Sequence, residues 1–191
     1  MKLKIGFFAI MLVLSFLLAP SLLSLCALIS ALLHELGHIG AARLCNIRLR
    51  ECQIGIYGAG LVPDGGVYSY SREIFLCLCG PLVNLICASV GIWFLNGENG
   101  AFWERFVFSS LALGLLNLLP VKGFDGGRIL GAFLLQFCPT RSAENMAAAL
   151  SFICVFLLWC VSVYLLIRFV ASLSLFIFSI SLFCRIFLSD Q

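Results

Sequence analysis

The chain has 191 residues, of which 62% are hydrophobic, 11% are charged and 18 are phenylalanine. Soluble domains are nearer to about half apolar and about a quarter charged, so a water-soluble protein is excluded. Disordered chains lack such aromatic and aliphatic runs, and a net charge of +3 gives no reason to expect a nucleic-acid partner. The composition indicates an all-α polytopic membrane protein, and at roughly 20 residues per span the length allows about six transmembrane helices.

Six apolar segments are the candidate spans. The first covers residues 5–19, follows Lys2 and Lys4 and ends before Pro20. We expect it to be retained rather than cleaved as a signal peptide, because no cleavage site of small residues follows it. The remaining spans are residues 22–44, 74–95, 102–119 and a helical hairpin within about 146–188. Within that hairpin, only Arg168 suggests where the chain turns.

Residues 46–72 differ in composition from the spans around them. Charged residues and glycines are concentrated there, and Pro63-Asp64-Gly65 is a turn signal. Apolar residues alternate with others at 53–57, which predicts short strands rather than a helix. We therefore expect a short β region between the second and third spans.

The distribution of lysine and arginine predicts the orientation of the chain in the membrane. With six spans and the N-terminus inside, only Arg105 and Arg168 fall outside, whereas the other ten of the 12 lie on the cytoplasmic side. Both termini are therefore expected to be cytoplasmic. The ten are Lys2, Lys4, Arg43, Arg48, Arg50, Arg72, Lys122, Arg128, Arg141 and Arg185.

The two histidines of the chain lie four positions apart, at His34 and His38, in the second predicted span. On a helix this spacing puts both imidazoles on one face, one turn apart, as two ligands of a single zinc ion require. Glu35 completes the pattern H-E-x-x-H, in which the carboxylate can take a proton from a water molecule activated by the metal.

These ionisable residues also lie deep within the predicted span. At 1.5 Å per residue, His34 lies roughly 14 Å from Arg43 at the cytoplasmic end of the span. Ionisable side chains at such a depth need partners or a bound cation, because burying them unpaired in lipid is costly. The alternative to a metal is a polar network that holds helices together.

A zinc ion held by two histidines needs a third protein ligand, and catalysis needs an open fourth position. None of the ten cysteines is convincingly placed, and the best carboxylate is Asp125, just after the fourth span. Pro120 and nearby glycines should unwind the chain there, which would let Asp125 fold toward a partner helix on the side of His38. An ordinary turn at Asp125-Gly126-Gly127 is the open alternative.

Three motifs occur in order on hydrophobic segments between about residues 20 and 137. They are His34-Glu35-Leu36-Gly37-His38, then Gly80-Pro81-Leu82-Val83-Asn84, then Asn117-Leu118-Leu119-Pro120 with Phe124-Asp125-Gly126-Gly127-Arg128. Together they resemble the site-2 protease family of intramembrane zinc metalloproteases, and the N-terminal half is most similar to the sporulation stage IV FB-type branch. The resemblance implies that residues 1–191 form a single transmembrane metalloprotease domain with its core at about 20–137.

The resemblance also implies a set of site residues and one Zn²⁺ per chain. The implied metal ligands are His34, His38 and Asp125, and the implied catalytic acid/base is Glu35. Candidates for shaping the site are Asn84, Asn117 and Pro120. Either asparagine could donate to a developing oxyanion, and the alternative role of both is to bridge helices. Many relatives carry a proline where Gly123 stands here, so the backbone before Asp125 is expected to be looser.

The function that follows from the resemblance is hydrolysis of a peptide bond in a membrane-associated protein, near the cytoplasmic face of the cell membrane. A sigma-factor precursor and a membrane-bound anti-sigma factor are the suggested substrates, and the resemblance allows for an inhibitory membrane partner. Residues 53–70 are similar to the membrane-associated β region of the family, which could pair with an extended substrate by strand addition.

Two other readings of the same residues compete with the enzyme. A non-enzymatic metal-binding or transport membrane protein could use the same polar cluster, but a transporter should offer acidic residues or histidines along a continuous path, whereas here the buried ionisable residues gather at one depth. A catalytically inactive relative that serves as a binding partner is less favoured, because Glu35 and every expected ligand are present.

Overall fold

The computed structural model describes residues 2–4, 20–45, 49–55, 58–63, 69–168 and 173–188. The first predicted span, residues 5–19, lies outside the described residues. The described helices are α2 (Leu22–Leu44), α3 (Tyr70–Ile92), α4 (Gly100–Leu118), α5 (Asp125–Phe137), α6 (Thr140–Arg168) and α7 (Leu173–Leu188). The described strands are β1 (Lys2–Lys4), β2 (Leu49–Gly55) and β3 (Gly58–Pro63).

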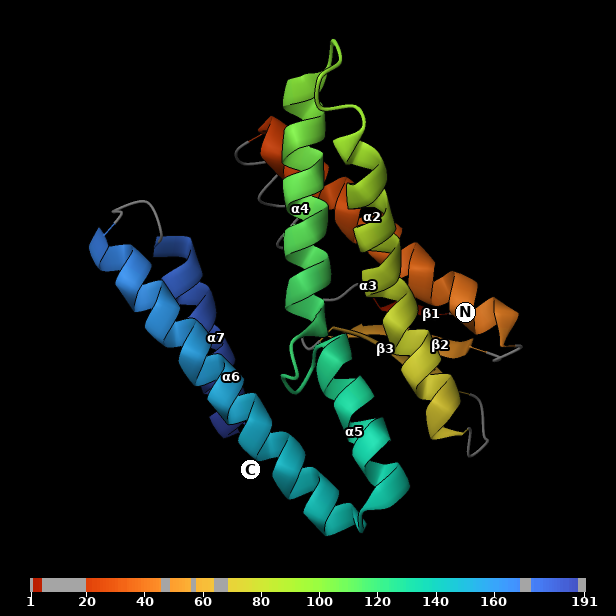
Figure 1. Cartoon of the computed structure of the whole chain (residues 1–191). Helices are drawn as coiled ribbons and strands as arrows, with labels where there is room; N and C mark the ends of the chain where they lie inside the picture. Colours follow the sequence, from red (N-terminus) through yellow and green to blue (C-terminus); the bar gives the residue numbers. More distant parts are fainter. Residues whose placement is uncertain are drawn as a thin grey trace.

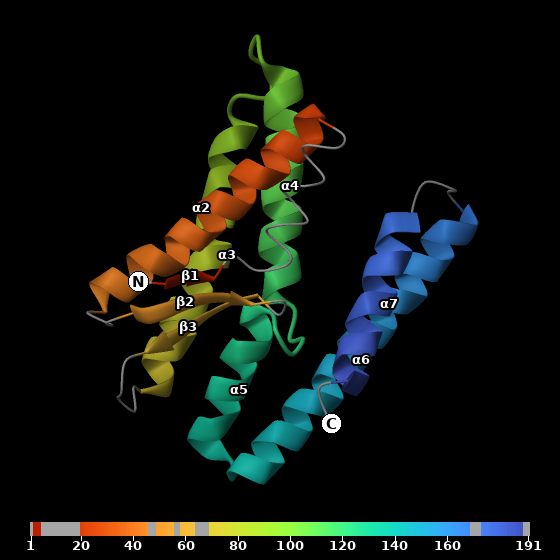
Figure 2. The ribbon, with the colours of Figure 1, turned by 180° about the vertical axis from the view of Figure 1, so that it is seen from behind.

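Helices α2, α3 and α4 pack against one another and form the centre of the molecule. Helix α2 crosses the other two obliquely, as the view from behind shows (Figure 2). Helix α5 continues beyond the lower end of α4 and packs against α3 (Figure 1). Helices α6 and α7 form a hairpin beside this group, and α6 packs mainly against α5 and α7.

Helix α2 begins at a capping box that its sequence encodes. The hydroxyl of Ser21 accepts a hydrogen bond from the Ser24 amide at 3.1 Å, and the hydroxyl of Ser24 accepts one from the Ser21 amide at 3.0 Å. The buried residues of the helix recur at intervals of three and four and so share one face, which packs on α3 and α4. They are Cys26, Ser30, His34, Gly37, His38, Ala41 and Ala42.

The chain leaves the helical conformation between α4 and α5, where the sequence predicts that it should. Helix α4 ends at Leu118, two residues before Pro120, and α5 begins at Asp125. Gly123 in this loop has a φ of 100°, a value that glycine adopts readily. Proline is held near −65°, so a proline in place of Gly123 would not fit this backbone.

Three of the described helices, α2, α3 and α6, are long and apolar enough to cross a membrane. The 19 residues of α4 include Glu104 and Arg105, which lower its hydropathy. The outer surface of the molecule carries large apolar side chains, which a lipid environment accommodates and water does not. The most exposed include Trp93, Phe108, Phe137, Tyr164 and Ile167. The chain is therefore a multi-pass membrane protein.

Two helices begin earlier than their apolar spans. The third span is expected at 74–95 and the hairpin at about 146, whereas α3 begins at Tyr70 and α6 begins at Thr140. The amide of Ala143 donates to the carbonyl of Pro139 at 3.0 Å, so α6 starts directly after that proline. The first turns of both helices are polar, and hydropathy detects where a helix becomes apolar rather than where it begins.

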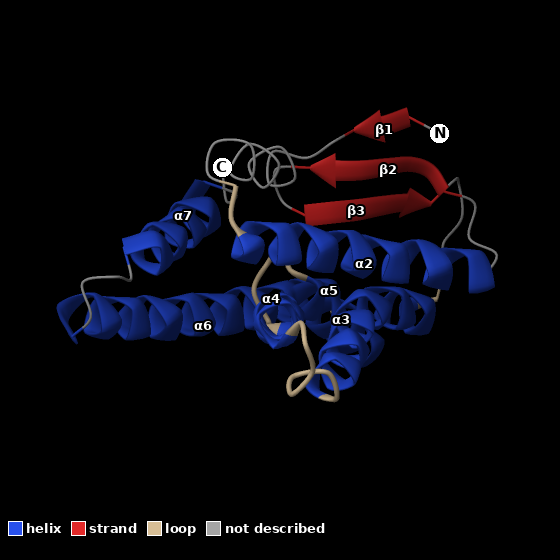
Figure 3. Ribbon diagram, turned by 90° about the horizontal axis from the view of Figure 1, so that it is seen from above, coloured by secondary structure: helices blue, strands red, loops and turns tan. Residues whose placement is uncertain are grey.

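The three described strands form one sheet in the order β1-β2-β3. Strand β1 is parallel to β2, whereas β2 and β3 are antiparallel, with Cys52 opposite Leu61. The sheet lies along the side of α2 (Figure 3). Strands β2 and β3 belong to the segment between α2 and α3 in which the sequence favours strands.

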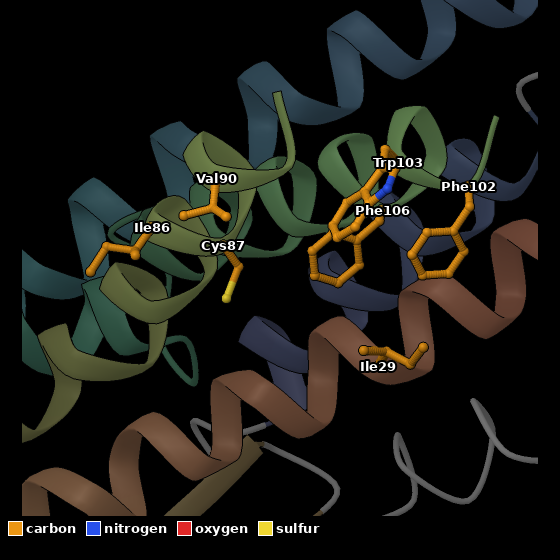
Figure 4. Close-up of a pocket in the computed structure, with 7 residues that line it drawn as sticks. All are labelled: Ile29, Ile86, Cys87, Val90, Phe102, Trp103 and Phe106. Atoms are coloured by element: carbon orange, nitrogen blue, oxygen red, sulfur yellow. The ribbon is translucent and has the colours of Figure 1, made fainter. Parts of the chain in front are cut away.

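An apolar cavity of about 320 Å³ lies among α2, α3 and α4 (Figure 4). The indole of Trp103 on its α4 side stacks on Phe94, with ring centroids 4.8 Å apart. The described residues that line the cavity present an apolar surface to it, which suits an apolar occupant rather than a polar ligand. The lining residues are Ile29, Ile86, Cys87, Val90, Phe102, Trp103 and Phe106.

Candidate metal centre

His34, His38 and Asp125 meet inside the protein, although 91 positions separate the first from the last. Oδ2 of Asp125 lies 3.0 Å from Nε2 of His34 and 3.2 Å from Nε2 of His38. The two Nε2 atoms are 3.2 Å apart. All three residues are buried, with exposures of 6%, 4% and 7%. The three residues therefore come together from two separate helices, α2 and α5, as a group that could hold a metal ion.

The spacing of these three atoms suits a zinc ion. Zinc forms bonds of about 2.0–2.1 Å to nitrogen and oxygen, and tetrahedral ligands at that length lie about 3.3 Å from one another. The observed separations of 3.0–3.2 Å are close to this value. Two imidazole nitrogens and one carboxylate oxygen also form a donor set of catalytic zinc sites, which leaves a fourth position for a reacting molecule. The residues present fit the metal.

The orientation of His38 is set by a backbone carbonyl of α3. Nδ1 of His38 lies 2.9 Å from the oxygen of Leu76. A carbonyl oxygen only accepts, so Nδ1 carries the proton and donates it. In the neutral ring, Nε2 then holds the lone pair and faces Asp125 and His34, which is the tautomer that a metal ligand needs.

Asn84 of α3 contacts the other imidazole. Its Nδ2 lies 3.4 Å from Nδ1 of His34, and the residue is fully buried. Its Oδ1 is buried too, without a hydrogen-bond partner in the described part of the chain. Turning the carboxamide by half a rotation would exchange the two ends and give that oxygen the Nδ1–H of His34 as a donor.

Gly80 leaves room for the two imidazoles at the crossing of α2 and α3. A Cβ atom at this position would overlap Nε2 of His38 and would lie 2.9 Å from Nε2 of His34. Gly37 on α2 has the reciprocal role, because a Cβ there would lie 2.7 Å from the carbonyl oxygen of Cys79. Both helices therefore need glycine to bring the histidines against α3.

Asp125 is the first residue of α5, and its place depends on close packing around the first turn of that helix. Gly126 faces the carbonyl oxygens of Leu118 and Leu119, and Gly127 faces that of Val121, with no room for a Cβ at either glycine. Arg128 also reaches α3, where its guanidinium lies 3.4 Å from the carboxylate of Glu73. Both kinds of contact hold the start of α5 beside α3 and the end of α4.

The other predicted site residues lie in different surroundings. Glu35 is half-buried on α2, next to His34. Asn117 donates from Nδ2 to the carbonyl of Leu113 in its own helix at 3.0 Å. The carbonyl of Pro120 accepts a hydrogen bond from Ser151 of α6. Of the two asparagines, Asn84 is the one whose side chain contacts an imidazole.

The sequence assigned no role to Leu76, to Ser151 or to Gly80, although Gly80 begins one of the three motifs. Gly80 gives a signal in retrospect, because it precedes Asn84 by one helical turn in an apolar span, where glycine marks a close helix contact. Leu76 acts through its backbone and Ser151 is one of several serines, so neither has a recognisable pattern.

The sequence and the fold also match known proteins. The model of peptidase family M50 matches residues 22–100 and 96–161. The chain is 27% identical over 164 residues to stage IV sporulation protein FB of Bacillus subtilis, a match that covers 83% of this chain. It is 29% identical over 139 residues to a zinc metalloprotease of Methanocaldococcus jannaschii, with 65% of this chain covered.

The fold resembles a solved structure, the site-2 protease from Methanocaldococcus jannaschii. The TM-score is 0.62 at 22% identity, and the match covers 96% of this chain and 86% of the other. The chain spans 57% of the length of the Bacillus relative and 39% of the length of the archaeal zinc metalloprotease. Since the family model covers most of the chain, this protein belongs to peptidase family M50, the site-2 protease family.

Proposed function

We propose that this protein is an intramembrane zinc metalloprotease that hydrolyses a peptide bond in a membrane-associated protein, near the cytoplasmic face. The observation that carries the proposal is the convergence of His34, His38 and Asp125 with their donor atoms all within 4.8 Å of one another, beside Glu35 on the same turn of α2. Family membership and the names of the relatives support the same conclusion.

The residues that would hold one zinc ion per chain are His34 and His38, through Nε2, and Asp125, through its carboxylate. Zinc supplies Lewis acidity when it is bound, because it polarises a peptide carbonyl and makes water a nucleophile near neutral pH. The protein keeps the three donors in place through the glycines at the α2–α3 crossing and the packed start of α5.

Glu35 is the proposed acid/base. Its carboxylate takes the proton of the attacking water and later delivers that proton to the departing amine, so that no free hydroxide or amide anion forms. Its half-buried position next to His34 suits this role, because the carboxylate interacts electrostatically with His34, His38 and Asp125 and is still partly exposed to the surroundings from which water and substrate arrive.

Asn84 is the proposed positioning residue for His34. With Oδ1 accepting from Nδ1–H of His34, the amide would fix the tautomer whose Nε2 binds metal, just as the carbonyl of Leu76 does for His38. Asn117 and Pro120 are proposed to shape the site indirectly. Asn117 lies in the last turn of α4 and Pro120 in the loop that follows, so both affect how the chain leads to Asp125.

The proposed substrate must present an extended strand, because a transmembrane helix hides its carbonyls in its own hydrogen bonds. Strand β3 is an edge strand of the described sheet, so it can accept such a segment by strand addition.

In this proposal the sheet is membrane-associated, six spans place both termini in the cytoplasm, and residues 1–191 act as one domain. The substrate class is a sigma-factor precursor or an anti-sigma factor, and an inhibitory membrane protein would regulate the site.

The experiment that tests the proposal is co-expression of the chain with candidate membrane substrates. Wild type should cleave a substrate, whereas Glu35→Gln should bind zinc normally and leave the substrate intact. The matched control is Glu104→Gln, which changes an exposed glutamate on α4 and should cleave normally. Wild-type cleavage by Glu35→Gln would rule out the proposed acid/base. Stoichiometric zinc binding without cleavage of any candidate would favour the non-enzymatic metal-binding protein.

A further inference from the structure

The loop between α4 and α5 is tied to the C-terminal hairpin by one hydroxyl group. Oγ of Ser151 on α6 accepts a hydrogen bond from the amide of Lys122 at 3.0 Å and donates one to the carbonyl of Pro120 at 3.0 Å. The side chain thus bonds to the backbone on both sides of Val121. Ser151 is 3% exposed, so the hydroxyl lies inside the contact between α6 and the loop, and its removal would break both hydrogen bonds at once.

Apolar packing reinforces the same contact. Val121 and Val155 are almost fully buried and pack with Leu182 of α7 in one cluster. Val155 follows Ser151 by four residues, so both point from the same face of α6 toward the loop. The α6–α7 hairpin therefore contacts residues 120–122 in two ways, through the hydrogen bonds of Ser151 and through the apolar packing of Val155 and Leu182 on Val121.

The loop in turn sets the position of Asp125. The carbonyl of Val121 accepts the amide of Phe124 at 2.9 Å and lies against Gly127 with no space for a Cβ between them. A shift of Val121 would therefore move the first turn of α5, to which Asp125 belongs. Displacement by only about 1 Å would spoil the 3.0–3.2 Å spacing to His34 and His38.

We infer that Ser151 is a positioning residue, whose hydroxyl holds the loop so that Asp125 reaches the two imidazoles at ligand distance. This inference rests on the proposed metal centre and extends it, because it gives the α6–α7 hairpin a role in building the site. A packing role alone would look different, as Ser162 shows. Ser162 on the same helix donates to Trp159 at 2.7 Å and pairs with Ser179 of α7 at 2.9 Å, away from the loop.

The test uses the whole chain in detergent, loaded with Co²⁺ as a spectroscopic substitute for zinc. Ser151→Ala should bind Co²⁺ about ten-fold more weakly, with a visible spectrum shifted toward that of Asp125→Ala. Ser151→Thr keeps the hydroxyl and should restore both the affinity and the spectrum. Ser162→Ala removes an equally buried hydroxyl from α6 and should match wild type. Circular dichroism reports whether each variant is folded, and Ser151→Cys, which replaces the hydroxyl by a group that hydrogen-bonds only weakly, takes its place if Ser151→Ala does not fold.

Two outcomes would overturn the inference. One is wild-type affinity and spectrum in Ser151→Ala, and the other is an equal loss in Ser151→Ala and Ser162→Ala, which would indicate general destabilisation. A wild-type chain that binds no Co²⁺ or Zn²⁺ would instead overturn the metal centre and the proposed function with it, so the two failures can be distinguished.

Discussion

Gly80 faces the imidazole of His38 so closely that a Cβ atom on Gly80 would lie 2.6 Å from Cε1 of that ring. The glycine is part of α3, whereas the ring belongs to α2, so the site requires the two backbones to approach with no side chain between them.

Gly80→Ala should weaken zinc binding by at least about ten-fold and reduce cleavage in parallel, because the methyl group displaces the Nε2 atoms of both histidines. Zinc titration of the purified variant measures the loss. The control is Gly40→Ala, since a Cβ at Gly40 would meet no atom of the described residues within 4 Å beyond the neighbouring backbone of its own helix. It should bind zinc as wild type does. Equal binding by both variants would show that the close approach is unimportant.

The two asparagines of the predicted site should differ in their effect on zinc binding. Asn84→Ala should lower zinc affinity by about 10- to 100-fold, because His34 loses the partner of its Nδ1. Asn117→Ala should leave affinity close to wild type, because Asn117 bonds to Leu113 of its own helix. Competition with a chromogenic chelator measures both constants. A larger loss in Asn117→Ala would reverse the assignment.

Zinc should stabilise the folded protein through Asp125. At a free zinc concentration of about 100 times the dissociation constant, binding adds about 2.7 kcal/mol to the free energy of unfolding, and thermal unfolding with and without a chelator measures it. Asp125→Ala should lose most of this increment, because the remaining ligands, His34 and His38, lie on α2 alone. An undiminished increment in the variant would place the metal elsewhere.

The positive φ of Gly123 should make the free energy of unfolding sensitive to substitution at this position. Gly123→Ala should lower the free energy of unfolding by about 1–2 kcal/mol, because an L-residue is strained at a φ of 100°. Gly131→Ala in α5 is the control, since in the described part of the chain a Cβ there meets no atom within 4 Å outside the adjoining backbone of α5. That variant should be as stable as wild type or up to about 1 kcal/mol more stable. Reversible unfolding in mixed micelles compares the two, and equal stabilities would contradict the strain.

The parts of the site that the sequence predicts are those that follow from local geometry. His34 and His38 share a helical face whatever the rest of the chain does, because four residues make about one turn. The position of Asp125 is predicted because Pro120 and the nearby glycines must end the helix before it. Helix α4 does end there, at Leu118. That these two local features come together depends on the packing of α3 between them, which the resemblance implied and the structure describes.

The remaining parts depend on contacts between elements, for which a single sequence gives little signal. The carbonyl of Leu76 is a backbone group and is the same for any residue type. The different surroundings of Asn84 and Asn117 arise from the way α3 and α4 face α2, although both are asparagines in apolar spans. The hydroxyl of Ser151 reaches a loop 29 positions earlier in the chain, a distance that no periodic pattern encodes.

The reciprocal glycine contact between α2 and α3 also restricts how this site can change. Gly37 approaches the carbonyl of Cys79, and Gly80 approaches the histidines, so a larger residue at either position would separate the same pair of helices. The effects of substitutions at the two positions should therefore be epistatic. Once a larger residue at one position has separated the helices, a larger residue at the other position causes little further loss. A library randomised at both positions and selected for activity should return glycine at both.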